Sequence, residues 1–223
     1  MTAVVAYADA EIAFVAGDTS RTYAGNVSIR ACKVHRWSDS VLLAQAGEAE
    51  HLTKLIAAVL PLGGFYGGNH HEFLKCFRQL NGTHWNNAVQ SYTAKGKATP
   101  EGTILIACAS TPADPAQVYK LDFETARLTA LGNCGADGTG GAALSEKALA
   151  ELNNLRGSSN APGIHLDTWA ARCIEGAALT NPGVVDWPAD MQIARPSGTS
   201  DRVVTYRRIA SADAAQLAEF LAP

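Results

Sequence analysis

Apolar residues gather into short, nearly unbroken runs near the start of the chain. Residues 2–8 and 11–17 are two such runs, and only Asp9 and Ala10 separate them, which is the length of a hairpin connection. Residues 41–47, VLLAQAG, form a third run, as expected of a strand that is covered on both faces. We therefore predict three strands here, the first two joined as a hairpin. Two shorter strand-like pieces are expected at 27–29 and 33–37.

After residue 51 the apolar positions change to the period of a helix. Leu52, Leu55, Ile56 and Val59 recur at spacings of three and four residues, so they share one helical face. Pro61 ends this helix and a glycine-rich connector follows. Further helices are expected at 70–80, 84–95, 144–155 and 167–181, with a short one after residue 211.

Strand patterns return between and after these helices, at 103–110, 118–123, 126–131, 191–195 and 202–209. The glycine-rich stretch 132–141, GNCGADGTGG, is expected to be a loop that precedes a helix. The resulting order is strands, helices, strands, helices and strands, with no internal repeat or linker. This order predicts a single domain over residues 1–223 in the α+β class, with two antiparallel sheets between two helical layers.

The composition is that of a globular protein and argues against several functions. Of the 223 residues, 47% are apolar and 17% are charged, so the chain can bury a full core. The net charge of −3, without a basic stripe, argues against nucleic-acid binding. No apolar run is long enough to span a bilayer, and residues 1–17 lack the basic segment of a secretory signal, so we expect no membrane association.

The cysteines indicate a reducing compartment. There are five of them, an odd number, and they are widely scattered without a CxxC pair. Such cysteines are typical of reduced thiols, so we expect a cytoplasmic protein. Cys134 is not favoured as a nucleophile, because no histidine lies near it in the sequence.

Two other stretches suggest ligand binding only at first sight. His70, His71, Glu72 and Cys76 are metal-binding residue types, but adjacent histidines on a helix point about 100° apart and no second ligand pair is present. The stretch 132–141 is rich in glycine but lacks the Lys-Ser/Thr and the spacing of a phosphate-binding loop. We therefore expect neither a metal nor a cofactor.

The start of the chain holds the residues from which the most specific chemistry can be inferred. Thr2 is small enough for Met1 to be removed, and it would then carry a hydroxyl and a free amine on one residue. Asp18 follows the second predicted strand, and Lys33 opens a short later one. A terminal threonine supplies a hydroxyl nucleophile and, in its own amine, a general base. A nearby aspartate and lysine supply charges that adjust the reactivity of both groups.

These residues occur in motifs that together resemble the proteasome superfamily, the Ntn-hydrolases of the proteasome β and HslV type. The motifs, in the family's order, are Met1-Thr2, AGD at 16–18, Lys33-Val34, QAGEAEHL at 45–52 and ALGN at 130–133. The expected element order fits the four-layer αββα sandwich of that family across essentially the whole chain. Among bacterial members the chain is most similar to Anbu and to the β-proteobacterial proteasome homologue, with PADM at 188–191 similar to the Anbu pattern.

The resemblance implies an N-terminal threonine endopeptidase with five catalytic positions. Thr2 would be the nucleophile and its own amine the base, while Lys33, fixed by Asp18, would stabilise the developing alkoxide. The backbone N–H of Gly47 would bind the oxyanion, and Asn133 stands where the family has a serine that supports the amine.

Two departures from the family pattern concern the surroundings of these residues. The segment between Asp18 and Lys33 is one residue shorter than in HslV. The family also has a later Asp-x-x-Ser pair near the amine, for which Thr180, Asn181 and Asp186 are all candidates.

The resemblance also implies which residues bind substrate. By position, Arg21, Ala31, Gln45 and Ala49 would line the pocket for the residue before the scissile bond. The two alanines leave room and Gln45 makes the floor partly polar, so medium or large side chains should be accepted.

Family members assemble with their active sites facing an inner chamber. This implies self-association into two stacked rings, a homo-tetradecamer, with a spiral of the Anbu kind as the alternative. Unfolded polypeptides would be the substrates, and an ATPase that unfolds them would be a partner. Two other functions stay open: a small-molecule Ntn amidohydrolase, and a non-catalytic scaffold subunit.

Overall fold

The computed structural model of the chain describes residues 2–22, 28–47, 49–62, 70–98, 101–138, 141–158, 166–180, 185, 189–195 and 203–209. Within these ranges the backbone alone is described for 20–22, 28–30, 49–51, 141–142, 155–158, 180, 195 and 203–209. The short helix expected after residue 211 lies outside the described residues.

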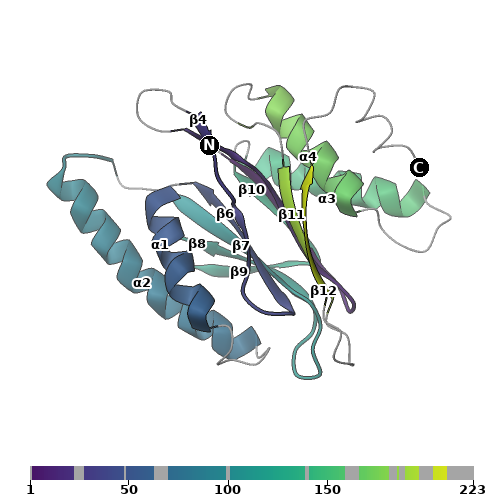
Figure 1. Cartoon of the computed structure of the whole chain (residues 1–223), viewed down its shortest axis with the longest axis horizontal. Helices are drawn as coiled ribbons and strands as arrows, with labels where there is room; N and C mark the ends of the chain where they lie inside the picture. Colours follow the sequence, from purple (N-terminus) through teal and green to yellow (C-terminus); the bar gives the residue numbers. More distant parts are fainter. Residues whose placement is uncertain are drawn as a thin grey trace.

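Two five-stranded antiparallel sheets form the centre of the fold (Figure 1). Sheet I has the strand order β10-β1-β2-β11-β12, with β1 Ala3–Ala8, β2 Ala13–Asp18, β10 Cys134–Gly138, β11 Ala189–Arg195 and β12 Val203–Ile209. Sheet II has the order β5-β6-β7-β8-β9, with β5 Val34–Arg36, β6 Val41–Gly47, β7 Gly102–Cys108, β8 Gln117–Asp122 and β9 Leu128–Gly132. A two-stranded ribbon of β3 Ser20–Thr22 and β4 Ser28–Arg30 extends from them.

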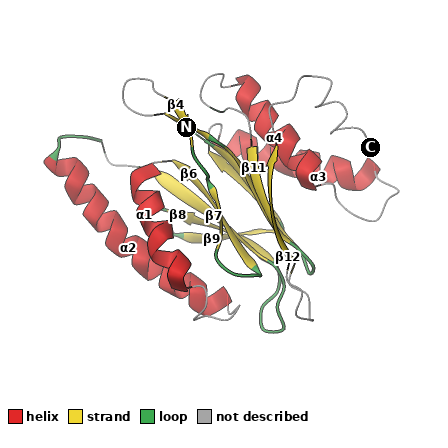
Figure 2. Cartoon of the chain, in the orientation of Figure 1, coloured by secondary structure: helices red, strands yellow, loops and turns green. Residues whose placement is uncertain are grey.

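Helices cover the outer face of each sheet (Figure 2). Helix α1, Ala49–Val59, and helix α2, His70–Ala94, lie over sheet II, and a 3-10 turn, Leu60–Leu62, ends α1. Helix α3, Gly141–Ser158, and helix α4, Leu166–Thr180, lie over sheet I. The predicted α+β class and the sandwich of two antiparallel sheets between helical layers are thereby confirmed.

The unbroken apolar runs arise because the strands are covered on both faces. In β1, Val5 and Tyr7 pack against α3 and α4, while Val4 and Ala6 pack between the two sheets. The inner layer consists mainly of alanine and valine together with a few leucines, among them Leu105 of β7. Side chains this small let the two sheets pack closely, so polar groups at the end of one sheet can reach the other.

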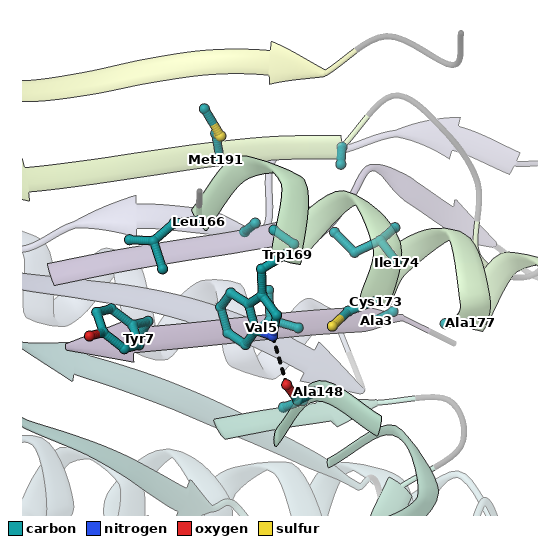
Figure 3. Packing of buried hydrophobic residues seen from close by; sticks show 14 of the residues in the cluster. Ala3, Val5, Tyr7, Ala148, Leu166, Trp169, Cys173, Ile174, Ala177 and Met191 are labelled. Carbon is teal, nitrogen blue, oxygen red and sulfur yellow. Dashed lines mark hydrogen bonds between the residues drawn. The ribbon is translucent and has the colours of Figure 1, made fainter. Parts of the chain in front are cut away.

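Trp169 of α4 organises the layer between the helices and sheet I (Figure 3). It is fully buried and packs edge-on to Tyr7, with ring centroids 6.5 Å apart. Its indole N–H donates a hydrogen bond to the carbonyl of Ala148 in α3 at 2.7 Å. This one side chain therefore joins α3 and α4 to β1, the strand that directly follows the candidate nucleophile.

Two predicted segments are wrong in ways that have a physical cause. The expected helices 70–80 and 84–95 are one continuous helix, because Asn81 is fully buried and donates from its side-chain amide to the carbonyl of Phe123 at 3.3 Å. The expected loop 132–141 contains β10, which pairs with β1 from Ala3 opposite Gly138 to Tyr7 opposite Cys134.

The Trp169 contacts lead to a stability prediction. We expect Trp169→Ala to lower the free energy of unfolding by about 3–5 kcal/mol, because it removes a large buried ring. Trp169→Phe should cost less, about 1–2 kcal/mol, mainly through the lost hydrogen bond to Ala148. Urea unfolding at a fixed protein concentration measures both, and Leu179→Ala, at a position that is 77% exposed on the same helix, is the control. A cost for Trp169→Ala no larger than that of the control would contradict this description of the packing.

Candidate active site

A buried aspartate at the end of β2 is the centre of the candidate site. The Asp18 side chain is fully buried, and each of its oxygens accepts a hydrogen bond from the Lys33 ammonium group at 2.9 Å. Its Oδ1 also accepts the backbone N–H of Ala3 at 2.8 Å. A buried ion pair is tolerated only when hydrogen bonds satisfy its charges, and three of them converge on this carboxylate.

Strand pairing brings the two charges together. In the pairing of β1 with β2, Gly17 lies opposite Val4, which places Asp18 at the start of β1. Lys33 directly precedes β5, and its carbonyl accepts the N–H of Gln45 at 2.9 Å, which extends the pairing of β5 with β6. The ion pair therefore links sheet I to sheet II at one end of the sandwich.

Thr2 lies directly before the amide that Asp18 binds. It is only 5% exposed, and the alternation of β1 puts it on the side of Val4, between the sheets. Gly138, the last residue of β10, lies against its backbone with a φ of +115°. A Cβ at Gly138 would be 1.9 Å from the Thr2 carbonyl oxygen, so only glycine fits there. The structure thus brings Thr2 to the Asp18–Lys33 pair; Met1 lies outside the described residues.

Gly47 occupies the same end of the sandwich on sheet II. It ends β6, two residues beyond the Gln45 amide that binds the carbonyl of Lys33. Its φ is +97°, and a Cβ there would lie 2.5 Å from both the Glu101 carbonyl oxygen and the Gly102 Cα. The chain therefore needs glycine at this position for both its backbone conformation and its close packing.

The prediction that Asn133 lies near the amine of Thr2 is wrong. Its side-chain amide donates to the carbonyl of Ala8 at 2.7 Å, and its own carbonyl accepts the Ala8 N–H at 2.8 Å. Ala8 is the last residue of β1, six residues after Thr2, so at the rise of a strand Asn133 is roughly 20 Å away. Because β10 runs antiparallel to β1, the turn that precedes β10 must lie at the far end of β1.

The residue that approaches Thr2 from this segment is Gly138. The sequence contains two pairs of a glycine and a small polar residue in this region, Gly132-Asn133 and Gly138-Thr139. The second pair is the nearer of the two to α3, which begins at Gly141, and this closeness to the helix is the signal that would have selected it. Thr139 lies outside the described residues.

The predicted substrate-binding residues are described to different extents. Gln45 is 4% exposed, and its side-chain oxygen has no hydrogen-bond partner among the described residues. Ala31 is partly buried and donates its N–H to the carbonyl of Thr19 at 2.8 Å. Both are close to Lys33, through the chain or through strand pairing. Arg21 is in β3 and Ala49 begins α1, but their side chains lie outside the described ones.

The three candidates for the later Asp-x-x-Ser pair stay open. Thr180 is the last residue of α4, and its side chain is outside the described ones. Asn181 and Asp186 lie outside the described residues altogether.

No helix within the described ranges is both long and apolar enough to cross a membrane.

The histidine-rich start of α2 has a structural explanation. The backbone N–H of His70 donates to the Asp114 carboxylate at 3.1 Å, and its ring Nε2 is 3.5 Å from the Ser40 hydroxyl. Burial lowers the pKa of His70, and the nearby Asp114 carboxylate partly opposes this. Among the described residues, no cluster of three His, Cys, Asp or Glu side chains could hold a metal ion.

A cavity of about 520 Å³ lies elsewhere, between α2 and the hairpin of β8 and β9. It is lined by His71, Leu74, Lys75, Arg78, Tyr119 and Leu128, among others. Leu74 and Leu128 belong to the cluster on the helical side of sheet II, whereas Thr2 faces the space between the sheets. The cavity is therefore separate from the candidate site.

The chain is similar to solved structures although neither a family model nor a curated protein sequence matches it. The Gly-1 mutant of Anbu from Hyphomicrobium sp. strain MC1 has a TM-score of 0.71 at 12% identity, covering 99% of this chain and 93% of that one. Anbu, the ancestral beta-subunit, from Yersinia bercovieri has a TM-score of 0.69 at 12% identity, covering 99% and 92%. The resemblance inferred from the motifs is confirmed at the level of the fold: this chain is folded as Anbu is.

The buried ion pair leads to a prediction for a double-mutant cycle. We expect Lys33→Met to lower the free energy of unfolding by about 3–5 kcal/mol, because it leaves the Asp18 carboxylate buried without its cation. Asp18→Asn should cost a similar amount, since it leaves the Lys33 ammonium group unpaired. The double variant should cost less than the sum, because it buries no isolated charge. Urea unfolding at matched protein concentration measures the coupling, and strictly additive costs would contradict a coupled pair.

Proposed function

We propose that this protein is an N-terminal threonine peptidase, in which removal of Met1 uncovers Thr2 as the nucleophile. The observation that carries the proposal is the position of the Asp18 carboxylate. It accepts hydrogen bonds from the Lys33 ammonium group at 2.9 Å and from the backbone N–H of Ala3 at 2.8 Å. A cation is thereby fixed beside the residue that precedes Ala3. Burial of Lys33 explains why this lysine has a counter-ion. It does not explain why the ion pair lies beside Thr2, and the proposed function does.

The proposed reaction begins with proton transfer from the Thr2 hydroxyl to the Thr2 amine, directly or through one water. An α-amine has an ordinary pKa of about 8, and the nearby Lys33 cation favours its neutral, accepting form. The alkoxide oxygen attacks the substrate carbonyl carbon, and the oxyanion that forms accepts a hydrogen bond from the backbone N–H of Gly47. Removal of one such donor raises the activation free energy by about 3–4 kcal/mol.

Collapse of the tetrahedral intermediate completes acylation and prepares the second half of the reaction. The C–N bond breaks, the amine of Thr2 gives its proton to the leaving nitrogen, and an ester on Thr2 remains. Water then loses a proton to the same amine, attacks the ester carbonyl and releases the acid, which restores the hydroxyl. The chain's own groups supply each proton transfer, so the proposed reaction requires no cofactor.

The substrates proposed are unfolded polypeptides that enter a chamber formed by copies of this chain. Self-association into two stacked rings, a homo-tetradecamer, is the assembly we propose, with a spiral as the alternative. Such a chamber excludes folded proteins, so a partner ATPase that unfolds them fits this function. Gln45, with Ala31 and the positions of Arg21 and Ala49, would form the pocket for the residue before the scissile bond.

We expect Thr2→Ala to abolish peptide hydrolysis because it removes the attacking oxygen and keeps the amine. The measurement combines turnover of a fluorogenic peptide with the intact mass of the protein after incubation with a peptide epoxyketone, which requires both the hydroxyl and the free amine. The wild-type chain should lack Met1 and gain the mass of one inhibitor, whereas Thr2→Ala should gain none. Thr93→Ala, at an exposed position of α2, is the control and should behave as the wild type.

Other outcomes would each reject part of the proposal. Turnover by Thr2→Ala at the wild-type rate would reject Thr2 as the nucleophile. Hydrolysis of small amides without hydrolysis of peptides would instead indicate a small-molecule amidohydrolase. A wild-type chain that has lost Met1 but neither reacts nor hydrolyses any amide would indicate a non-catalytic subunit.

A further inference from the structure

A second ion pair lies between the sheets. Asp137, on β10, is 8% exposed, and its Oδ2 lies 2.7 Å from the Lys120 ammonium nitrogen in an ion pair and accepts a hydrogen bond from the Thr103 hydroxyl at 2.6 Å. Its Oδ1 accepts the backbone N–H of Gly138 at 2.7 Å. Lys120 and Thr103 are on β8 and β7, so one carboxylate of sheet I holds two strands of sheet II.

Asp137 lies on the same face of sheet I as Thr2. In the pairing of β1 with β10 it is opposite Val4, whose side chain packs between the sheets. Thr2 precedes Val4 by two residues, and strand residues two apart point to the same side. Diagonal neighbours on one face of an antiparallel pair have centres about 7–8 Å apart. The carboxylate is therefore in the layer around Thr2.

The first link from Asp137 to the candidate site runs through Gly138. The position of the Gly138 backbone sets the space left for Thr2, because a Cβ there would be 1.9 Å from the Thr2 carbonyl oxygen. The Asp137 carboxylate holds the N–H of this glycine through a charge-assisted bond, which is about twice as strong as a neutral one. A displacement of Asp137 would therefore displace the Gly138 backbone that packs against Thr2.

The second link runs through Thr103 to Gly47. Thr103 follows Gly102 in β7, and the Gly102 Cα is 2.5 Å from the point where a Cβ of Gly47 would be. Gly102 and Gly47 are also partners in the β6–β7 register. A hydrogen bond that fixes Thr103 therefore fixes the strand on which Gly47 packs.

We propose that Asp137 is a positioning residue that sets the distance between the Thr2 nucleophile and the Gly47 oxyanion donor. The proposal rests on the proposed function, which assigns those two roles. Asp137 holds the neighbour of each, Gly138 on sheet I and Thr103 on sheet II, with Lys120 as its counter-ion. A misplacement of about 1 Å in such a pair can lower a rate roughly 100-fold, so a single carboxylate that connects the two sheets can control catalysis from outside the reacting atoms.

The kinetic test compares variants that remove different contacts of Asp137. Asp137→Ala removes all of them and is expected to lower kcat at least tenfold, with KM changed less than twofold. Asp137→Asn keeps an oxygen that can accept the Gly138 N–H, so it should stay within threefold of the wild type. Thr103→Val removes only the hydrogen bond to β7, so its kcat should lie between those of Asp137→Ala and Asp137→Asn.

Asp9 supplies the matched control. It is an aspartate at the other end of β1, and its carboxylate accepts the N–H groups of Glu11 and Ile12, both at 2.8 Å, and the Tyr7 hydroxyl at 3.0 Å. Asp9→Ala therefore also removes three polar contacts, but at the turn between β1 and β2, away from Thr2. It should lower the stability and leave kcat within twofold. Equal losses of kcat in Asp9→Ala and Asp137→Ala, or no loss in either, would overturn the proposal.

A second measurement keeps the inference testable if the wild type proves inactive. Hydrogen–deuterium exchange by mass spectrometry follows the amides of residues 3–7 and 135–138. We expect Asp137→Ala to speed exchange in both segments at least tenfold, and Asp9→Ala to leave 135–138 unchanged. An inactive wild type with this exchange pattern would reject the proposed function while retaining Asp137 as the support of Thr2. Unchanged exchange in Asp137→Ala would overturn the positioning proposal whatever the activity.

Discussion

The structure depends on a constraint at one end of the sandwich, where a carboxylate and an ammonium group are buried together. Asp18 is fully buried and Lys33 is 4% exposed, so burying either charge without the other would cost free energy of folding. The third group on the carboxylate is the Ala3 N–H, which ties the start of β1 to the pair. The polar contact therefore fixes the position of the chain's second residue, and the surrounding sheets and helices supply the apolar packing that the pair itself does not provide.

The geometry around this pair follows from the close approach of two sheets whose inner faces carry small residues. Glycines occur where backbones meet most closely, at Gly47 against Gly102 and at Gly138 against Thr2. The Asp137 carboxylate then bridges the gap from β10 to Thr103 and Lys120. Two ion pairs thus link the same two layers, one at the candidate nucleophile and one beside it.

The sequence predicted the parts of this arrangement that local pattern controls. Unbroken apolar runs identified β1, β2 and β6, and chain order brought Asp18 and Lys33 into one hypothesis. Strand β10 was missed because its residues have low strand propensity, and it is a strand only because the edge of β1 needs a partner. That error also led to Asn133, since the register of β10 against β1 decides which of two glycine-containing pairs reaches Thr2. Burial of Asn81, within the single helix α2, likewise depends on its contact with Phe123, which follows β8 and which no local pattern reveals.

The proposed function requires that Lys33 makes the amine of Thr2 a base at neutral pH. The most direct test is an NMR titration of the Thr2 amine in the processed chain, with threonine labelled with ¹⁵N, compared between the wild type and Lys33→Met. We expect an amine pKa below the ordinary value of about 8 in the wild type and a higher pKa in the variant, because the cation disfavours a second positive charge. Equal pKa values in the two proteins, or a wild-type value above the ordinary one, would contradict it.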